Sequence, residues 1–221
     1  MNGLIDKLGL CIERGKINKT SPYPADMKGE EGADELSAKA LSEGIGSEIV
    51  LDACSAGMQR IGEKFGRGEV FIPELLMSAK AMKAVMEHLK PYFQTGTVKT
   101  KGRLVIGTVA GDLHDIGKNL VSMVASGNGW EVIDLGVDVR TAAFIDAIKA
   151  NPGCAVGLSA LLTTTMTNMT KTVSEIKSAF PETKVIVGGA PLTREKAEKM
   201  GADGYSPDPQ GAVEFLNKNC A

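Results

Sequence analysis

The sequence predicts an α/β protein in which a four-helix bundle precedes a doubly wound, five-stranded parallel sheet. Apolar residues recur at helical spacing up to about residue 90. From residue 102 onward, short apolar runs alternate with helical patterns, which is the element order of a parallel sheet. The segment 91–101, PYFQTGTVKTK, follows neither pattern. We therefore expect a helical bundle at 1–90, a linker at 91–101 and a sheet domain at 102–221.

The helices of the first part follow the apolar spacing. Pro, Gly and charged residues crowd the segment 16–32, which is typical of a loop. A turn is expected at GRGEV, and Pro73 is suited to the first turn of the last helix. The expected helices lie near residues 4–12, 34–41, 47–65 and 73–90, and short connections between them indicate a bundle.

Five strands and five helices are expected in the second part. The first strand, RLVIGTV, is continuously apolar, as strands buried on both faces are. Ligands of such sheets bind beyond the carboxyl ends of the strands, so the loops after Val109, Leu158 and Val187 are the candidates for a site. The expected strands are 103–109, 131–135, 155–158, 184–187 and 203–205, and the helices are 118–126, 141–150, 166–180, 194–200 and 211–217.

Composition excludes several classes of protein. The net charge is −2 and no basic stretch is present, which argues against a nucleic-acid partner. No apolar run approaches the roughly 18 residues of a membrane span, and the N-terminus lacks the apolar core of a signal peptide. The four cysteines are widely scattered, which favours reduced thiols in a cytoplasmic protein. Histidine chemistry has two possible positions, His88 and His114, and we expect His88 to be solvated.

The loop after the first strand, GDLHDIGKNLV, carries Asp112 two residues before His114. An aspartate so placed can accept a hydrogen bond from one ring nitrogen and leave the other free for a metal. The alternative is that Asp112 caps the helix while His114 merely packs. The loop lacks phosphate-binding glycine patterns and the three or four ligands that zinc needs. A lone histidine ligand suits a metal already held by a tetrapyrrole-type macrocycle.

Two further loops complete a pattern. Ser159 begins S-x-L, and Gly188 and Gly189 follow the fourth predicted strand. The order D-x-H-x-x-G, S-x-L, G-G resembles the signature of cobalamin-binding domains, in which a histidine binds below cobalt and the corrinoid is base-off. The segment IGEKFGRGEVFIPELLMSAKAM resembles the helical cap that precedes this domain in methionine synthase and in corrinoid methyltransferase proteins. The resemblance covers about residues 34–217.

The resemblance implies a Rossmann-like (flavodoxin-like) cobalamin-binding domain and a methyl carrier that is not a complete enzyme by itself. Its cobalt would cycle between cobalt(I) and methyl-cobalt(III), with the axial histidine released and rebound in each cycle. The implied partners are a substrate-specific methyltransferase, a second methyltransferase that serves tetrahydrofolate or a thiol, and a reductive activator. Specificity for the methyl donor would belong to the partner methyltransferase, so this sequence does not identify the donor.

The resemblance also implies roles for individual residues. His114 is the expected cobalt ligand, Asp112 its hydrogen-bond partner, and Thr165 stands where methionine synthase has the serine that closes the relay. Ser159 and Thr163 would line the cleft for the nucleotide tail, for which the two glycines would leave room, although an ordinary strand-to-helix turn also explains such a pair. Phe65 and Ile72 would cover the upper face of the cofactor, unless they belong to the helix core. The other expected cofactor contacts are Gly111, Leu113, Asp115, Gly117 and Leu161.

Three alternatives come from other classes. A cobalamin-dependent sensor or regulator can share both parts but needs a DNA-binding module. The cobalamin subunit of an isomerase shares the D-x-H loop but normally lacks this cap. A plain flavodoxin-like binding module would make the three-loop pattern accidental.

Overall fold

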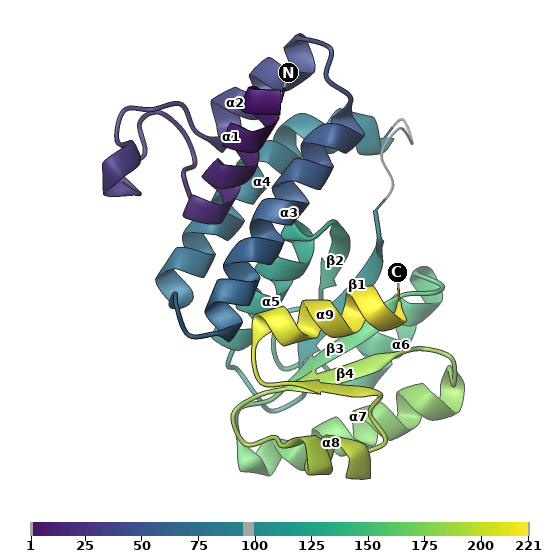
Figure 1. The fold of residues 1–221 in the computed structure, drawn as a ribbon. Coiled ribbons are helices and arrows are strands. Elements are labelled where there is room, and N and C mark those ends of the chain that lie inside the picture. Colours follow the sequence, from purple (N-terminus) through teal and green to yellow (C-terminus); the bar gives the residue numbers. More distant parts are fainter. Residues whose placement is uncertain (1, 95–99, 221) are drawn as a thin grey trace. The chain divides into compact units, whose positions relative to one another are not determined.

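The computed structural model describes residues 2–94 and 100–220, which fall into two compact units (Figure 1). The first unit contains the chain up to residue 100 together with residues 126–129. The second contains residues 101–125 and the chain from residue 130 onward. No helix in the described ranges is long and apolar enough to cross a membrane.

The first unit is the expected four-helix bundle. Each of its four α-helices contacts the other three. Glycines let the first and third helices approach closely, because a Cβ atom on Gly57 would overlap the backbone oxygen of Gly9. The segment expected to be a loop holds one short 3-10 turn, η1 (Ala25–Met27). The helices are α1 (Asn2–Arg14), α2 (Ala33–Ser42), α3 (Ser47–Gly66) and α4 (Ile72–Gln94).

The end of α4 differs from the prediction. We expected the helix to stop at residue 90 and a linker to begin at Pro91, but the helix continues to Gln94 with Pro91 inside it. Proline has no backbone N–H, so the helix lacks one hydrogen bond in its last turn. Residues 95–99 of the expected linker lie outside the described residues.

Glu13, a partly buried residue of α1, joins three helices of this unit. Glu13 of α1 accepts hydrogen bonds from Arg60 at 2.5 Å and Lys64 at 2.6 Å, both on α3. Ser78 of α4 donates to the Glu13 backbone oxygen at 3.1 Å. Burial alone would raise the pKa of the Glu13 carboxyl, but the hydrogen bonds from Arg60 and Lys64 outweigh it and lower the pKa.

The second unit contains a five-stranded sheet in which every neighbouring pair is parallel, in the order β2-β1-β3-β4-β5. The predicted fold class is therefore confirmed. Apolar residues of alternate strand positions pack against α6 (Thr141–Ala150), α7 (Met166–Ala179) and α8 (Arg194–Lys199) on one face. Helices α5 (Ile116–Gly127) and α9 (Pro209–Asn219) lie on the other face (Figure 1). The strands are β1 (Gly102–Thr108), β2 (Trp130–Asp134), β3 (Ala155–Ser159), β4 (Val185–Gly188) and β5 (Gly204–Ser206).

The helices of this unit agree with the prediction to within two residues at each end. Helix α5 begins at Ile116 and α9 at Pro209, each two residues earlier than expected. Asp208 explains the second case, because its carboxylate accepts from the Gly211 N–H and caps the helix. The helices are α5 (Ile116–Gly127), α6 (Thr141–Ala150), α7 (Met166–Ala179), α8 (Arg194–Lys199) and α9 (Pro209–Asn219), with the 3-10 turn η2 (Thr163–Thr165) before α7.

The strand order creates a switch point between β1 and β3. The chain leaves β1 for β2 on one side and returns to β3 on the other, so the loops after β1 and β3 diverge from adjacent strand ends. Ligands of open α/β sheets bind at such points. The D-x-H loop follows β1 and the S-x-L segment follows β3, so the topology brings these two motifs together.

Candidate functional site

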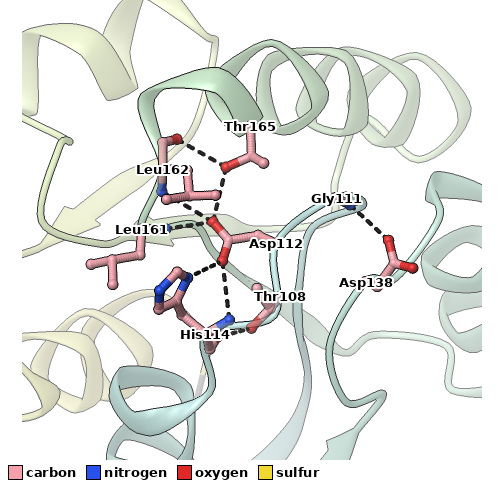
Figure 2. A network of polar contacts seen from close by, with 8 residues as sticks. All are labelled: Thr108, Gly111, Asp112, His114, Asp138, Leu161, Leu162 and Thr165. Atoms are coloured by element: carbon pink, nitrogen blue, oxygen red, sulfur yellow. Dashed lines mark hydrogen bonds and ion pairs between the residues drawn. The ribbon is translucent and has the colours of Figure 1, made fainter.

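The loop between β1 and α5 carries the two residues at the centre of the site. The ring nitrogen Nδ1 of His114 lies 2.7 Å from Asp112 Oδ1, and the His114 backbone N–H donates to the same oxygen at 3.1 Å (Figure 2). Thr108, buried at the end of β1, donates from its hydroxyl to the His114 backbone oxygen at 2.8 Å. The histidine is therefore held through both its ring and its backbone.

Asp112 connects this loop to the one after β3. Its second oxygen, Oδ2, accepts from the backbone N–H groups of Leu161 at 2.7 Å and Leu162 at 3.1 Å, and lies 2.9 Å from the Thr165 hydroxyl (Figure 2). Its side chain is fully buried. Burial alone would raise the pKa of the Asp112 carboxyl, but the hydrogen bonds from His114, Leu161 and Leu162 outweigh it and hold the pKa well below its usual range.

An ionised Asp112 can only accept hydrogen bonds, so the Nδ1 of His114 must be the donor. This selects the histidine tautomer whose Nε2 carries a lone pair when the ring is neutral. The His114 side chain is 49% exposed, and no hydrogen bond joins Nε2 to another described residue. The arrangement therefore presents one oriented imidazole nitrogen at the surface of the unit, which is how metal-binding histidines are prepared.

The Thr165 hydroxyl has two acceptors for its single proton. It lies 2.9 Å from Asp112 Oδ2 and also 2.9 Å from the Leu162 backbone oxygen. Thr165 is buried, and its side chain reaches Asp112 although a threonine replaces the serine of the resembled pattern. The structure thus brings together His114, Asp112 and Thr165, the three residues that sequence reasoning grouped.

Large apolar side chains on the two segments that carry His114 and contact Asp112 are exposed. Exposed apolar surface of this kind is typical of a binding face. His114 does not belong to any group of three or more His, Cys, Asp or Glu side chains that could hold a metal ion within the described ranges. One oriented nitrogen on a loop with exposed apolar side chains fits a metal that is already held by a macrocycle. The exposed side chains are Leu113 at 72%, Ile116 at 75%, Leu161 at 43% and Leu162 at 40%.

The remaining predicted residues of this unit lie on the same edge of the sheet. Thr163 is exposed in η2, and Ser159 is half-buried at the end of β3, where its backbone oxygen accepts from the Val109 N–H. The remaining members of the D-x-H loop and the first turn of α5, which are Gly111, Asp115 and Gly117, are exposed.

The glycine pair has a reason within the fold. Gly189 has φ +136°, and a Cβ atom there would lie 1.8 Å from the Ala160 backbone oxygen. At Gly188 a Cβ atom would lie 3.3 Å from the Ser206 oxygen. The close approach of two loops therefore requires glycine at 189 whether or not a ligand is present.

The first unit holds the two residues expected to cover a cofactor. Phe65 lies near the end of α3 and is half-buried, whereas Ile72 opens α4 and is 45% exposed. Phe71, which the sequence analysis did not single out, is 69% exposed. His88 is not simply solvated as expected, because its Nε2 lies 2.7 Å from Asp34 Oδ1 on α2. The two positions are 54 residues apart, and no local signal marks the pair.

Sequence reasoning also missed two residues that hold the D-x-H loop. Asp138, in the loop between β2 and α6, accepts from the Gly111 N–H at 2.7 Å (Figure 2). Asn168 of α7 donates from its side chain to the Ala110 oxygen at 2.7 Å. Both contacts join segments that are distant in the sequence, and neither residue lies in a recognisable motif.

Comparisons with known proteins identify relatives of both parts of the chain. Residues 102–214 match the family described as B12 binding domain, and residues 29–90 match a second family of the same description. Trimethylamine corrinoid protein 2 of Methanosarcina mazei is 39% identical over 189 residues, which cover 83% of this chain and 87% of that protein.

Two solved structures are similar. A cobalamin-binding protein from Desulfitobacterium hafniense superposes with a TM-score of 0.72 at 32% identity, covering 85% of this chain and 91% of the other. A chain of the methanol:cobalamin methyltransferase complex of Methanosarcina barkeri gives a TM-score of 0.80 at 26% identity, covering 99% of this chain and 80% of that chain.

Proposed function

The chain belongs to the family of B12-binding corrinoid proteins, with cobalamin or a related corrinoid as its cofactor, and on that premise we propose that it carries methyl groups between two methyltransferases. When bound, the corrinoid supplies a cobalt centre that accepts a methyl group and gives it up again. The observation that carries the proposal is the oriented imidazole of His114, whose side chain is 49% exposed and is hydrogen-bonded to a fully buried Asp112. The chain's own contribution is to bind, orient and shield that centre.

His114 is the proposed lower axial ligand in a base-off, histidine-on complex. Asp112 fixes the tautomer of His114 and strengthens its donation to the metal, as carboxylates behind metal-bound histidines do. Because Asp112 is held ionised, it stays a hydrogen-bond acceptor for Nδ1 of His114. The Thr165 hydroxyl can donate to Asp112 or to the Leu162 oxygen.

The other predicted residues complete the proposed site. Leu113 and Leu161 supply apolar contacts to the macrocycle, and Ser159 and Thr163 line the path of the displaced nucleotide tail beside Gly188 and Gly189. Phe65 and Ile72 of the first unit shield the upper face from water and oxidants. Backbone groups of the exposed loop residues Gly111, Asp115 and Gly117 border the site.

The proposed partners follow from the chemistry of a carrier. A substrate-specific methyltransferase delivers the methyl group, a second one passes it to tetrahydrofolate or a thiol, and a reductive activator restores oxidised cobalt. The names of the similar proteins make methylated amines and methanol the donors to examine first. A cytoplasmic location is part of the same proposal and is consistent with the free, mostly buried cysteines.

Reconstitution with methylcobalamin tests the proposed site. Wild-type protein should retain about one corrinoid per chain after desalting and show a base-off, histidine-bound visible spectrum. His114→Ala should lose that spectrum and bind the corrinoid at least about tenfold more weakly. His88→Gln is the matched control, because it changes the other of the two histidines and should leave the spectrum intact. An unchanged spectrum in His114→Ala would rule out the assigned ligand.

The upper ligand distinguishes a carrier from the alternatives. Corrinoid extracted in the dark from protein produced by its own cells should carry a methyl group during growth on the methylated substrate. An adenosyl ligand under the same conditions would contradict the carrier role and favour a sensor or an isomerase subunit.

A further inference from the structure

Asp138 is the one non-glycine residue with a positive φ in the part of the chain that the structure describes. Its φ of +53° lies in the left-handed region, where a residue with a Cβ atom pays roughly 1–2 kcal/mol. Aspartate tolerates this region better than most residues, and glycine occupies it without cost. A non-glycine residue kept in this conformation therefore suggests that its side chain is needed.

The side chain and the backbone of Asp138 both form hydrogen bonds with the segment Gly111–Asp112. The carboxylate Oδ1 accepts from the Gly111 N–H at 2.7 Å, and the Asp138 N–H donates to the Asp112 backbone oxygen at 3.0 Å. The next residue, Val139, forms a parallel bridge with Val109. Asp138, on a neighbouring loop, thus binds the N–H group before and the carbonyl group after the Gly111–Asp112 peptide.

That segment sets the direction of the Asp112 side chain. Gly111 itself has φ +84°, so the backbone reverses immediately before Asp112. Asp112 Oδ2 must reach the backbone N–H groups of Leu161 and Leu162 while Oδ1 faces His114, as Figure 2 shows. A change in the peptide before Asp112 would rotate the carboxylate away from one of these two sets of donors.

We propose that Asp138 is a positioning residue for the His114 ligand and acts through Gly111 and Asp112. This inference rests on the proposed function, because it assigns to Asp138 a part in aiming His114 at cobalt. Asn168 also holds the preceding residue, Ala110, so removing the Asp138 carboxylate loosens the loop without freeing it. We therefore expect an effect of about tenfold on corrinoid affinity, the lower end of the range for groups behind a metal ligand.

Three substitutions separate the hydrogen bond from the backbone strain. Asp138→Asn keeps an acceptor oxygen and tolerance of positive φ. Asp138→Gly removes the acceptor and the strain together, whereas Asp138→Ala removes the acceptor and leaves the strain. Asp146→Ala is the matched control, since it removes an exposed carboxylate of the same unit from α6.

Two readouts are measured on each variant. The first is the dissociation constant of hydroxocobalamin by equilibrium dialysis. The second uses apoprotein and needs no cofactor: ¹⁵N–¹H correlation of the histidine rings at mildly alkaline pH reports which nitrogen of His114 carries the proton. With two histidines in the sequence, the His88→Gln variant assigns both rings.

Asp138→Ala and Asp138→Gly should each weaken corrinoid binding about tenfold and mix the two tautomers of His114. Asp138→Asn should remain within about threefold of wild type, because it keeps a neutral form of the same hydrogen bond. Wild-type affinity in Asp138→Gly would overturn the inference, whether or not Asp138→Ala is impaired. If wild-type protein failed to bind corrinoid, the proposed function would be overturned as well. If wild-type protein bound corrinoid normally and the Asp138 variants matched it in affinity and in the tautomer of His114, this inference alone would be overturned.

Discussion

Replacing Asp112 with asparagine tests how the carboxylate selects the tautomer of His114. The change is nearly isosteric but turns one of the two acceptor oxygens into an NH₂ donor. On the Oδ2 side, that group would face the fixed N–H donors of Leu161 and Leu162. On the Oδ1 side, it would face one fixed donor, the His114 backbone N–H, and the ring nitrogen Nδ1, which can give up its proton.

The number of fixed donors therefore places the NH₂ group beside His114. It then donates to Nδ1, and the ring proton moves to Nε2, the atom proposed to bind cobalt. One donor–donor contact and the loss of the negative charge should cost about 3 kcal/mol of folding stability. Corrinoid affinity should fall about 10- to 100-fold, as expected for the partner of a metal-bound histidine.

Histidine ring ¹⁵N spectra of the apoprotein, corrinoid dialysis and urea denaturation measure the three effects. Asp112→Glu is a useful comparison, because it retains the charge and changes the reach of the side chain. If Asp112→Asn kept the proton on Nδ1 of His114 and bound corrinoid like wild type, the account of Asp112 as the tautomer-selecting group would be refuted.

Two further predictions concern stability. Because the pKa of Glu13 is lowered in the folded protein, its stabilising contribution is present above the usual glutamate pKa of about 4.3 and is lost as the pH falls through the lowered value. Glu13→Gln should therefore be about 1 kcal/mol less stable than wild type at neutral pH, and this difference in the free energy of unfolding should shrink as the pH falls. Urea denaturation over a range of pH measures it, and a difference that does not depend on pH would contradict the role of Arg60 and Lys64. Gly189→Ala should lower the folding stability by about 3 kcal/mol or more, because the added Cβ atom would overlap the Ala160 oxygen. A loss of stability below about 0.5 kcal/mol would show that the loops after β3 and β4 separate easily.

The element order and the centre of the site were predictable because both depend on local patterns. Apolar runs alternating with helical spacing identify parallel strands, and the end of each strand locates its loop. Asp112 and His114 are two residues apart, so their contact needs only the loop between them. Thr165 was placed beside Asp112 through the family resemblance rather than through any spacing rule.

What the sequence did not reveal depends on contacts between distant segments. Asp138 reads as an ordinary loop residue in GVDV, and its contacts with Gly111 and Asp112 join the loops that follow the neighbouring strands β2 and β1. The His88 to Asp34 contact likewise joins two helices. Pro91 suggested a helix end because a proline disfavours a helix interior, but one lost hydrogen bond in the final turn did not end α4.

The central claim is that the nitrogen below cobalt comes from His114 and not from the corrinoid's own base. Protein labelled with ¹⁵N at histidine and loaded with unlabelled cobalamin, reduced to the cobalt(II) state, answers this by electron paramagnetic resonance. A coordinated ¹⁵N nucleus splits each cobalt line into a doublet, whereas ¹⁴N gives a triplet. The account predicts doublets that disappear in His114→Ala. Triplets in the labelled wild-type protein would show that the corrinoid base remains bound to cobalt and would contradict the account.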